Sequence, residues 1–395
     1  MSLVSRRHSA PSVAVVGAGV IGLSVAWGLA ESGCAVDLYD EQPGQGASHA
    51  AAGMLAPASE TVYGEDALLA LGLSSALLWP DFAARLSQSS GIDVRLRQQG
   101  SLLVGHDADD AAALRRVAEH LSRHGLAAES LSGRQARALE PALSPQTRAA
   151  LLLPADDSVD NRRVVEALLV AAEHAGVRLH RRRVSVAVSE LGAVGVSSPT
   201  AEGTCGTVER ADQVVLAAGA GSADVQGLPR WAVPAVRPVK GQILRLRGGH
   251  GLLTHTLRAT VAGVPVYLVP RGDGGIVLGA TSEDVGADVR VTAGGVHEML
   301  RAAIAVVPEV AELELVETLA RLRPTTPDNG PLIGPSPLPG LLLATGHYRG
   351  GMLLAPATAR ALTDLVHGRA VMPVVRPFHP HRFDTGAVHP LEVTA

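Results

Sequence analysis

Cysteine is almost missing from this sequence, which has only Cys34 and Cys205 among its 395 residues. Two thiols without a spacing pattern form neither a disulfide framework nor a metal-binding motif, and low cysteine use is typical of a reducing compartment. Long apolar runs are missing as well, because no stretch of 18 apolar residues occurs, whereas a membrane-spanning helix needs about 20. These absences predict a protein without structural disulfides, a bound metal or a membrane span.

An excess of positive charge is the third absence. The chain has 34 Lys and Arg against 38 Asp and Glu, a net charge of −4, and therefore offers no basic field to a nucleic acid. We interpret the arginines at 178 and 181–183 as a solvated strand end. The pair Arg6-Arg7 is superficially similar to an export signal, but the apolar run that follows covers only residues 13–16, which is too short. We therefore expect a cytoplasmic protein that binds neither nucleic acid nor membrane.

What the sequence does contain is a contiguous dinucleotide fingerprint. An apolar strand at 13–16 leads into Gly17-Ala18-Gly19-Val20-Ile21-Gly22, and a helix over 23–30, a second strand over 35–39 and Asp40 follow. The three glycines permit a tight turn, close approach of the backbone to a pyrophosphate, and close helix–strand packing. The helix N-terminus attracts the phosphates, and the acid accepts hydrogen bonds from a ribose. This order predicts a bound dinucleotide but does not distinguish NAD from FAD.

A run of very small residues, PGQGASHAAAGMLAP, follows at 43–57. Such residues cannot form a core by themselves, but they leave little side chain between the backbone and a flat ligand. An alanine-rich loop that begins a helix is the other interpretation of the same composition. The residue types alone therefore indicate a ligand-facing segment without establishing it.

The rest of the chain alternates helical and extended patterns, and its length and 47% hydrophobic content are sufficient for two or three domains. From the periodicity we expect helices over 68–87, 107–124, 134–139 and 160–174, and strands over 91–104, 177–179, 184–188 and 213–216. Residues 231–315 are rich in strand patterns. The strand at 213–216 ends in Ala217-Ala218-Gly219, and α/β sheets bind cofactors at such carboxyl strand ends.

Three motifs in this order resemble the D-amino-acid oxidase superfamily of flavoproteins, most closely its glycine oxidase branch. They are SHAAAGMLAP at 48–57, RLRPTTPD at 321–328 and ATGHYRGGMLLAPATA at 344–359, and the resemblance covers roughly residues 12–383. It implies an α/β (α+β) fold in which a Rossmann-like FAD-binding domain is interleaved with an antiparallel-sheet substrate domain. The implied segments are 12–84, 151–231 and 324–384 for FAD and 85–150 and 232–323 for the substrate, with flexible termini at 1–11 and 385–395.

The resemblance also implies FAD as the cofactor, held noncovalently because His347 and Tyr348 have no cysteine beside them. The flavin accepts the hydride in such enzymes, so few catalytic side chains are needed. The residues that the fingerprint and the resemblance assign to the cofactor are Gly17, Gly19, Val20, Ile21, Gly22, Asp40, Glu41, Ser48, Ala51, Ala52, Gly53, Met54, Val184, Ala218, Gly219, Gly346, His347, Tyr348, Arg349, Gly350, Gly351 and Met352.

The substrate carboxylate is assigned by the resemblance to Arg323, in the pattern R-P-x-T-x-D, together with Tyr267 and Arg349. A planar guanidinium suits this task because it pairs with a carboxylate through two parallel hydrogen bonds. Without the family pattern, the same arginine would be interpreted as a surface residue beside a proline-rich turn, and the tyrosine as a core residue. Met54, Ser282 and Gly350 are expected to border the substrate pocket.

Three positions depart from the family pattern. Gly350 stands where asparagine is common, Ser282 where some relatives have methionine or valine, and His49 where tryptophan is frequent. These changes remove bulk or polarity around the expected pocket, which favours an N-substituted glycine over free glycine as the substrate.

We therefore expect an FAD-dependent oxidase of glycine or N-substituted glycines. It would transfer a hydride to the flavin, reduce O2 to hydrogen peroxide, and release glyoxylate with ammonia or a primary amine. An oxidase or dehydrogenase of larger D-amino acids is one alternative. A flavin-binding protein without turnover is another, although Arg323 and Tyr267 argue against it. The sequence leaves open the oligomeric state, a homo-oligomer included, and the choice between thiamine synthesis and a specialised amino-acid pathway.

Overall fold

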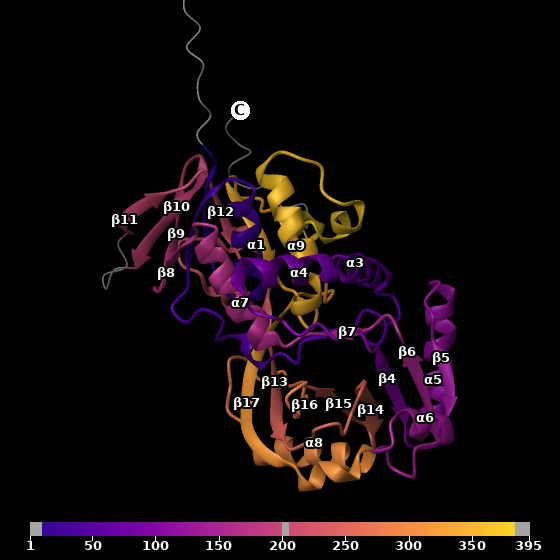
Figure 1. The fold of residues 1–395 in the computed structure, drawn as a ribbon. Coiled ribbons are helices and arrows are strands. Elements are labelled where there is room, and N and C mark those ends of the chain that lie inside the picture. Colours follow the sequence, from indigo (N-terminus) through magenta and orange to yellow (C-terminus); the bar gives the residue numbers. More distant parts are fainter. Residues whose placement is uncertain (1–9, 200–204, 384–395) are drawn as a thin grey trace, which may run out of the picture.

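The computed structural model describes residues 10–199 and 205–383. Two large sheets organise these residues, one in the upper half of Figure 1 and one in the lower half. Strands and helices from distant parts of the sequence meet in each half, and the predicted α/β fold class is confirmed. Apart from Ala10 and Pro11, the termini that we expected to be flexible lie outside the described residues.

The first sheet has six strands in the order β18-β19-β12-β1-β2-β8. All pairs are parallel except β18 with β19, and parallel strands require crossover connections, here largely helical. The strand bounds are Ser12–Val16 (β1), Ala35–Tyr39 (β2), Arg178–His180 (β8), Gln213–Leu216 (β12), Leu332–Pro335 (β18) and Leu341–Thr345 (β19). The carboxyl ends of β1, β2 and β12 therefore meet at one edge of this sheet.

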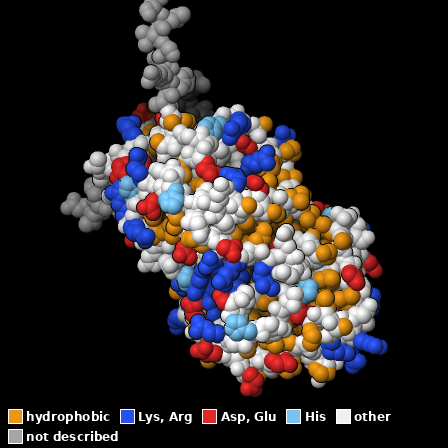
Figure 2. Space-filling view, in the orientation of Figure 1, with side chains coloured by type: hydrophobic (Ala, Val, Ile, Leu, Met, Phe, Trp, Pro, Cys, Tyr) orange, Lys and Arg blue, Asp and Glu red, His pale blue; other side chains and the backbone are white. Residues whose placement is uncertain are grey.

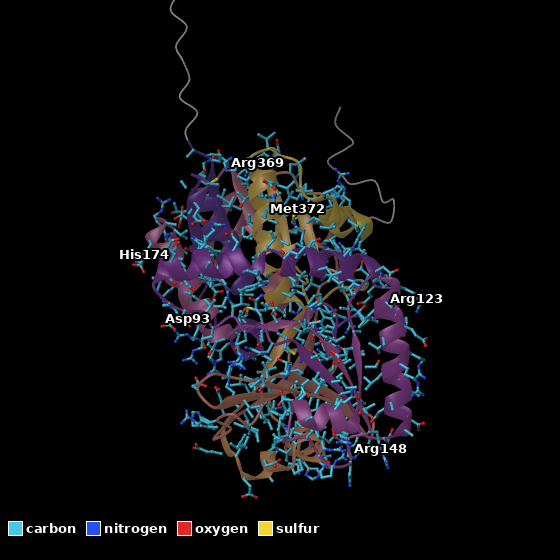
Figure 3. The ribbon with its side chains drawn as sticks, turned by 45° about the vertical axis from the view of Figure 1, so that its right-hand side comes forward. Asp93, Arg123, Arg148, His174, Arg369 and Met372 are labelled. Atoms are coloured by element: carbon cyan, nitrogen blue, oxygen red, sulfur yellow. The ribbon has the colours of Figure 1, made fainter. Side chains whose placement is uncertain are left out.

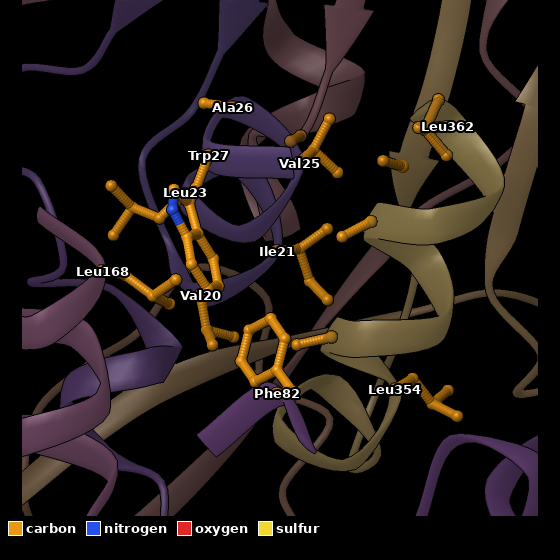
Figure 4. Packing of buried hydrophobic residues seen from close by; sticks show 14 of the residues in the cluster. Val20, Ile21, Leu23, Val25, Ala26, Trp27, Phe82, Leu168, Leu354 and Leu362 are labelled. Carbon is orange, nitrogen blue, oxygen red and sulfur yellow. The ribbon is translucent and has the colours of Figure 1, made fainter. Parts of the chain in front are cut away.

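Helices pack around this sheet and form the largest apolar core. Helix α1 (Val20–Glu31) is almost completely buried and lies against α9 (Gly351–Val366) and α7 (Asn161–His174). Figure 4 shows Trp27 of α1 between Phe82 and Leu168, and the rings of Trp27 and Phe82 meet edge to face, 5.4 Å apart. Burial of this helix on all sides fixes the position of its N-terminus at the sheet edge.

The predicted single helix over 68–87 is wrong. Two helices are found instead, α3 (Asp66–Ala76) and α4 (Trp79–Ser90), bent by 45° at the break. Pro80 lies in the first turn of α4, where its missing N–H is tolerated, but its ring prevents the preceding helix from continuing straight through. Within the described ranges no single helix has the length and apolarity to cross a membrane, although this bent pair meets both criteria by length and composition.

The second sheet has eight strands in the order β17-β13-β16-β15-β14-β4-β6-β5 and is antiparallel except where β14 meets β4. Helix α8 (Ala293–Val306) covers one face of it, and α5 (Ala108–Arg123) packs beside β4 and β6. The strand bounds are Ser101–Gly105 (β4), Glu129–Ser132 (β5), Ala149–Leu153 (β6), Arg237–Arg247 (β13), Thr256–Val261 (β14), Val264–Pro270 (β15), Gly275–Gly279 (β16) and Glu314–Thr325 (β17).

Two predictions for this half need correction. The strand predicted over 91–104 is confined to β4, because Arg95 has φ 56°, a left-handed conformation that interrupts an extended chain.

Helix α8 was missed within the strand-rich segment. It begins at Thr292, whose hydroxyl accepts a hydrogen bond from the Gly295 N–H. Its buried side chains, Met299, Ala302, Ala303 and Val306, follow the helical period.

The remaining elements are short or lie at the margins. They are α2 (Ala47–Ala50), β3 (Met54–Leu55), α6 (Gly133–Leu139), β7 (Asp157–Ser158), β9 (Ser185–Ser189), β10 (Gly192–Pro199), β11 (Cys205–Arg210), and 3-10 turns at Gly219–Asp224, Arg230–Ala232, Pro308–Glu312, Pro373–Phe378 and Pro380–Phe383. The expected domain division assigns 151–153 and 324–325 to the FAD-binding part, whereas β6 and β17 carry these residues in the eight-stranded sheet.

Several charged side chains on the surface form ion pairs. On the face shown in Figure 2, basic side chains gather below the middle of the molecule, with acidic side chains among them. In the arginine group at 178–183, Arg178 pairs with Asp37, Arg182 with Glu209 and Arg183 with Glu41. These partners neutralise the strand end locally.

Candidate active site

A cavity of about 730 Å³ is lined by residues of both sheets. From the six-stranded sheet come the turn after β1, the carboxyl ends of β2 and β12, and the loop between β19 and α9. From the eight-stranded sheet come residues of β13, β14, β15, β17 and β4. The cavity therefore joins the predicted dinucleotide site to the predicted substrate residues.

The dinucleotide end of the cavity is formed by the turn between β1 and α1. A Cβ at Gly22 would overlap the carbonyl oxygen of Gly17, so only glycine permits this close packing of helix and strand. Helix α1 begins after Gly19, which has no side chain of its own to cap the helix, and its first turn contains no acid. The positive end of the helix dipole therefore faces the cavity, as an anion site requires.

Asp40 and Ser48 hold this turn in place. Asp40 follows β2 and lines the cavity, where its Oδ2 accepts a hydrogen bond from the Ala18 N–H at 2.8 Å. The Ser48 hydroxyl accepts one from the Val20 N–H at 2.9 Å. The first of these contacts fixes a carboxylate beside the glycine turn, where a ribose is predicted to bind.

The small-residue segment 47–54 lines the cavity and is held from behind by buried polar side chains. Arg271 donates to the carbonyls of Ala52, at 2.7 Å, and Val159, at 2.8 Å. Asn161 donates to the carbonyls of Ser48 and His49, at 2.8 and 3.1 Å. Arg271 is 8% exposed, and burial lowers its pKa to about 10, so it remains charged at neutral pH. We infer that these two side chains position the segment.

The loop between β19 and α9 forms a further part of the cavity wall. His347 is buried, and its Nε2 lies 3.0 Å from the Thr358 hydroxyl. Burial lowers the pKa of His347 to about 3, so the ring is neutral at physiological pH. The Tyr348 N–H donates to the Pro324 carbonyl at 2.6 Å, and the guanidinium of Arg349 lies 4.9 Å from the centre of the Tyr348 ring. All three side chains line the cavity.

The predicted carboxylate residues lie across the face of the eight-stranded sheet. Arg323 of β17 extends over Gly241 of β13, and Tyr267 of β15 over Gly279 of β16, since a Cβ on either glycine would overlap the side chain. Arg323 donates to the Thr281 carbonyl at 3.0 Å. Glycine inside a strand often marks close approach of another group, and this signal was present in the sequence but not used.

The phenol of Tyr267 lies among charged groups. Burial raises its pKa, and the charges of Arg323 and Arg258 oppose that rise. The phenol therefore remains protonated at neutral pH and can donate a hydrogen bond to an anion in the cavity.

Sequence reasoning missed an ion pair in this cavity wall. Arg258 of β14 donates to Glu60 at 2.8 Å, and its Nη1 lies 3.9 Å from the Met54 sulfur. Both charged side chains line the cavity and are about one-fifth exposed. No local motif marks them, because they come from segments almost 200 residues apart.

Five predicted site residues do not line this cavity: Gly22, Glu41, Val184, Gly346 and Gly350. Glu41 pairs with Arg183 on the surface, and Val184 is buried in an apolar cluster with Tyr39 and Val186. The Thr326 side chain occupies the space that a Cβ on Gly346 would need. Gly350 precedes α9 and packs near Leu354, so its small size opens no space in the cavity. The other predicted residues, Ser282 included, line it, with Ser282 exposed.

These residues fit a dinucleotide cofactor. The glycine turn, the N-terminus of α1 and Asp40 would provide its phosphate and ribose contacts, and the segment of small residues would provide a flat wall beyond them. A two-sheet fold with such a site, and with an arginine and a tyrosine across the cavity, defines an oxidoreductase of the dinucleotide-binding class.

The particular family is established by comparison. The chain belongs to the FAD-dependent oxidoreductases, because the family model DAO, described as FAD dependent oxidoreductase, matches residues 12–365. The predicted family and the predicted FAD cofactor are thereby confirmed.

Individual relatives cover nearly the whole chain. Glycine oxidase of Geobacillus kaustophilus is 33% identical over 369 residues, which are 93% of this chain and 95% of that protein. A crystal structure of glycine oxidase from that organism has a TM-score of 0.84 and covers 94% of this chain and 99% of its own. Iminodiacetate oxidase from Chelativorans sp. BNC1 is 26% identical, with a TM-score of 0.83 over 93% of this chain and 98% of its own.

A longer relative matches as well. The bifunctional protein ThiO/ThiG of Trichormus variabilis is 33% identical over 377 residues, which are 95% of this chain and 55% of that protein. The chain therefore spans about half the length of this relative.

Proposed function

We propose that this protein is an amino-acid oxidase for glycine or N-substituted glycines. It would use FAD and O2 and release glyoxylate, hydrogen peroxide, and ammonia or a primary amine. The observation that carries the proposal is the placement of Arg323 and Tyr267 on one cavity wall, each across a glycine that leaves room for it. The names of two similar proteins, glycine oxidase and iminodiacetate oxidase, support the substrate class.

The guanidinium of Arg323 binds the substrate carboxylate through paired hydrogen bonds. Its contact with the Thr281 carbonyl fixes its orientation, so little side-chain freedom is lost when the substrate binds. Tyr267, protonated because its pKa is raised, donates to the same carboxylate. Arg349, exposed at the cavity mouth, adds positive charge that attracts the anionic group.

Fixing the carboxylate also fixes the α-carbon, which is one bond away. FAD, held by the glycine turn, the N-terminus of α1 and Asp40, would supply the acceptor for a hydride from this carbon, with O2 as the final electron acceptor. Residues 50–53, which also line the cavity, have no side chain larger than a methyl group, so the cofactor can lie close to their backbone. Catalysis by this chain is then mainly a matter of orientation.

The proposal is tested by anaerobic mixing of the FAD-loaded protein with glycine, sarcosine, N-butylglycine and D-alanine. We expect the glycines to bleach the flavin absorbance, and aerobic turnover to yield equal amounts of peroxide and glyoxylate. Faster bleaching by D-alanine than by every glycine would replace this function with D-amino-acid oxidation. No bleaching by any of them would reject both.

The cofactor is proposed to be noncovalent. Acid precipitation should then release the flavin into the supernatant, and yellow colour that stays in the pellet would show a covalent bond.

A further inference from the structure

The wall that carries Tyr267 continues across the sheet in one row. In the register of the strands, Tyr267 of β15 lies opposite Arg258 of β14, and Arg258 lies opposite Leu103 of β4. Residues directly opposite each other on neighbouring strands point to the same face. Leu103 therefore shares the face of Tyr267, two strands and about 10 Å away.

Helix α5 covers the far end of this row. Its Leu114 and Val117 are half-buried, line the cavity, and pack with Leu103 at the edge of the apolar cluster around Leu121 and Leu151. Figure 3 shows α5 standing along the outside of the molecule, with Arg123 at its end nearer the six-stranded sheet. The cavity thus extends beyond the predicted catalytic residues into an arm, lined by Leu103, Leu114 and Val117, that is larger than glycine requires.

The entrance to this arm passes the Arg258–Glu60 pair. The Nη1 atom of Arg258 lies 3.9 Å from the Met54 sulfur and donates a hydrogen bond to the Glu60 carboxylate at 2.8 Å. The two charges neutralise each other. An uncharged chain can pass without separating them, whereas an anionic group must compete with Glu60 for Arg258 and is repelled by that carboxylate.

We propose that the arm binds the substituent on the substrate nitrogen, and that this substituent is an uncharged apolar chain. The inference rests on the proposed function and deepens it. The arm lies between β4 and α5, whereas the sequence predicts space for this substituent at Ser282 and Gly350, of which Ser282 lines the cavity. Arg258 and Glu60 determine specificity at its entrance, because they favour neutral substituents over the carboxymethyl group of iminodiacetate.

Binding of alkoxyacetates tests the arm without turnover, because an ether oxygen replaces the oxidisable amine. Methoxyacetate, butoxyacetate and oxydiacetate are titrated into the FAD-loaded protein by calorimetry. Butoxyacetate has three more methylene groups than methoxyacetate. Since each buried methylene contributes a factor of about four, butoxyacetate should bind around 50-fold more tightly. Oxydiacetate, the analogue of iminodiacetate, should bind more weakly than butoxyacetate.

Two variants on one helix locate the binding. Leu114→Trp fills the arm and should remove most of the advantage of butoxyacetate while methoxyacetate affinity stays within about twofold. Arg115→Trp, the matched control, adds the same ring to the exposed face of α5 and should change neither affinity.

Glu60→Gln should improve oxydiacetate binding at least tenfold, because Arg258 then lacks its anionic partner.

The outcomes separate this inference from the proposed function. Equal binding of methoxyacetate and butoxyacetate, or an equal loss of both affinities in Leu114→Trp, would overturn the proposed role of the arm. Oxidation of glycine or sarcosine would still uphold the proposed function. Tighter binding of oxydiacetate than of butoxyacetate by the unmodified protein would overturn the uncharged class. A protein that oxidises no glycine but shows the butoxyacetate preference would overturn the function and leave the arm established.

Discussion

The two walls of the cavity differ in the size of the side chains that form them. The wall that carries the predicted cofactor residues consists largely of backbone and very small side chains, Gly17 and Gly19 and then Ala50 to Gly53, and buried polar groups hold the second of these segments from behind. The wall that carries the predicted substrate residues consists of long side chains, Arg323, Tyr267 and Arg258, of which Arg323 and Tyr267 extend over glycines of neighbouring strands. A wall of backbone suits a large cofactor that must approach closely, and a wall of side chains can be changed residue by residue to suit a substrate.

The walls also respond to acid in opposite ways. His347, on the cofactor side, has its pKa lowered by burial. Asp156, which accepts hydrogen bonds from the Ala58 and Ser59 N–H groups behind Glu60, has its pKa raised by burial. Neutral forms are favoured at both positions, so acidification should weaken the first and strengthen the second. Four predictions test this contrast.

The largest effect is expected at Arg323. Arg323→Ala should lower kcat/KM by roughly 30-fold to several thousand-fold, because the loss of one partner of a buried charge pair costs about 2–5 kcal/mol. FAD should remain bound, because the cofactor contacts lie on the other wall. Steady-state kinetics and flavin absorbance measure the two quantities, with Arg290→Ala, at an exposed position, as the control. Near-normal kcat/KM would place the carboxylate elsewhere, with Arg349 the first residue to examine.

His347 should make the protein sensitive to acid. Its folded-state pKa of about 3 lies below the ordinary value of 6.5, so its contribution to stability is fully present above pH 6.5. That contribution is lost as the pH falls from 6.5 toward 3. The full loss is on the order of 5 kcal/mol at about 1.4 kcal/mol per pKa unit. His347→Gln should flatten this decline in the free energy of unfolding, and His297→Gln, at an exposed site, should not. Parallel pH profiles for the original protein and His347→Gln would refute the assignment.

Asp156 should show the reverse trend, with a smaller amplitude. Its folded-state pKa of about 6 lies above the ordinary 3.8, so its contribution is fully present below pH 3.8. This contribution of Asp156 to the free energy of unfolding, roughly 3 kcal/mol, is lost as the pH rises through 6. The difference in free energy of unfolding between the original protein and Asp156→Asn, followed by denaturant titration from pH 4 to 7, should therefore fall with rising pH. The same difference for Asp224→Asn should stay constant. A rising difference for Asp156→Asn would reverse the sign and contradict the burial argument.

Tyr267→Phe is expected to have the mildest effect on catalysis. One hydrogen bond to a charged group contributes about 1.5–3 kcal/mol, so kcat/KM should fall roughly 10- to 150-fold, mostly through KM if the hydroxyl holds the carboxylate in the ground state. Tyr63→Phe, at an exposed tyrosine, is the control. A larger loss than in Arg323→Ala would make the phenol the principal carboxylate ligand.

The same contrast explains what could be predicted from the sequence. Contiguous motifs mark the cofactor wall, so the strand-turn-helix from Ser12 to Glu31, Asp40 and the segment after it were found where expected. On the other wall Arg323 and Tyr267 were identified through a family pattern. Arg258 and Glu60 were missed, because strand pairing alone brings together residues almost 200 positions apart. The prediction for Gly350 rested on a departure from the family pattern, and the structure places this residue beside Leu354, outside the residues that line the cavity.

Local chemistry accounts for the errors in the elements. Pro80 divides one apolar helical pattern into α3 and α4, and the left-handed backbone of Arg95 ends an alternating pattern that otherwise reads as a strand. Helix α8 was hidden within a strand-rich segment because its start, Thr292 and Ala293 followed by Gly294 and Gly295, is a weak helical signal.

The central claim is that one wall fixes the carboxylate while the arm between β4 and α5 receives the substituent on the nitrogen. A crystal structure of the FAD-loaded protein with butoxyacetate tests it most directly. The account predicts the carboxylate paired with Arg323 and Tyr267, and the butyl chain between Leu103 and Leu114, past an intact Arg258–Glu60 pair. A butyl chain directed toward Ser282, or a carboxylate bound away from Arg323, would contradict it.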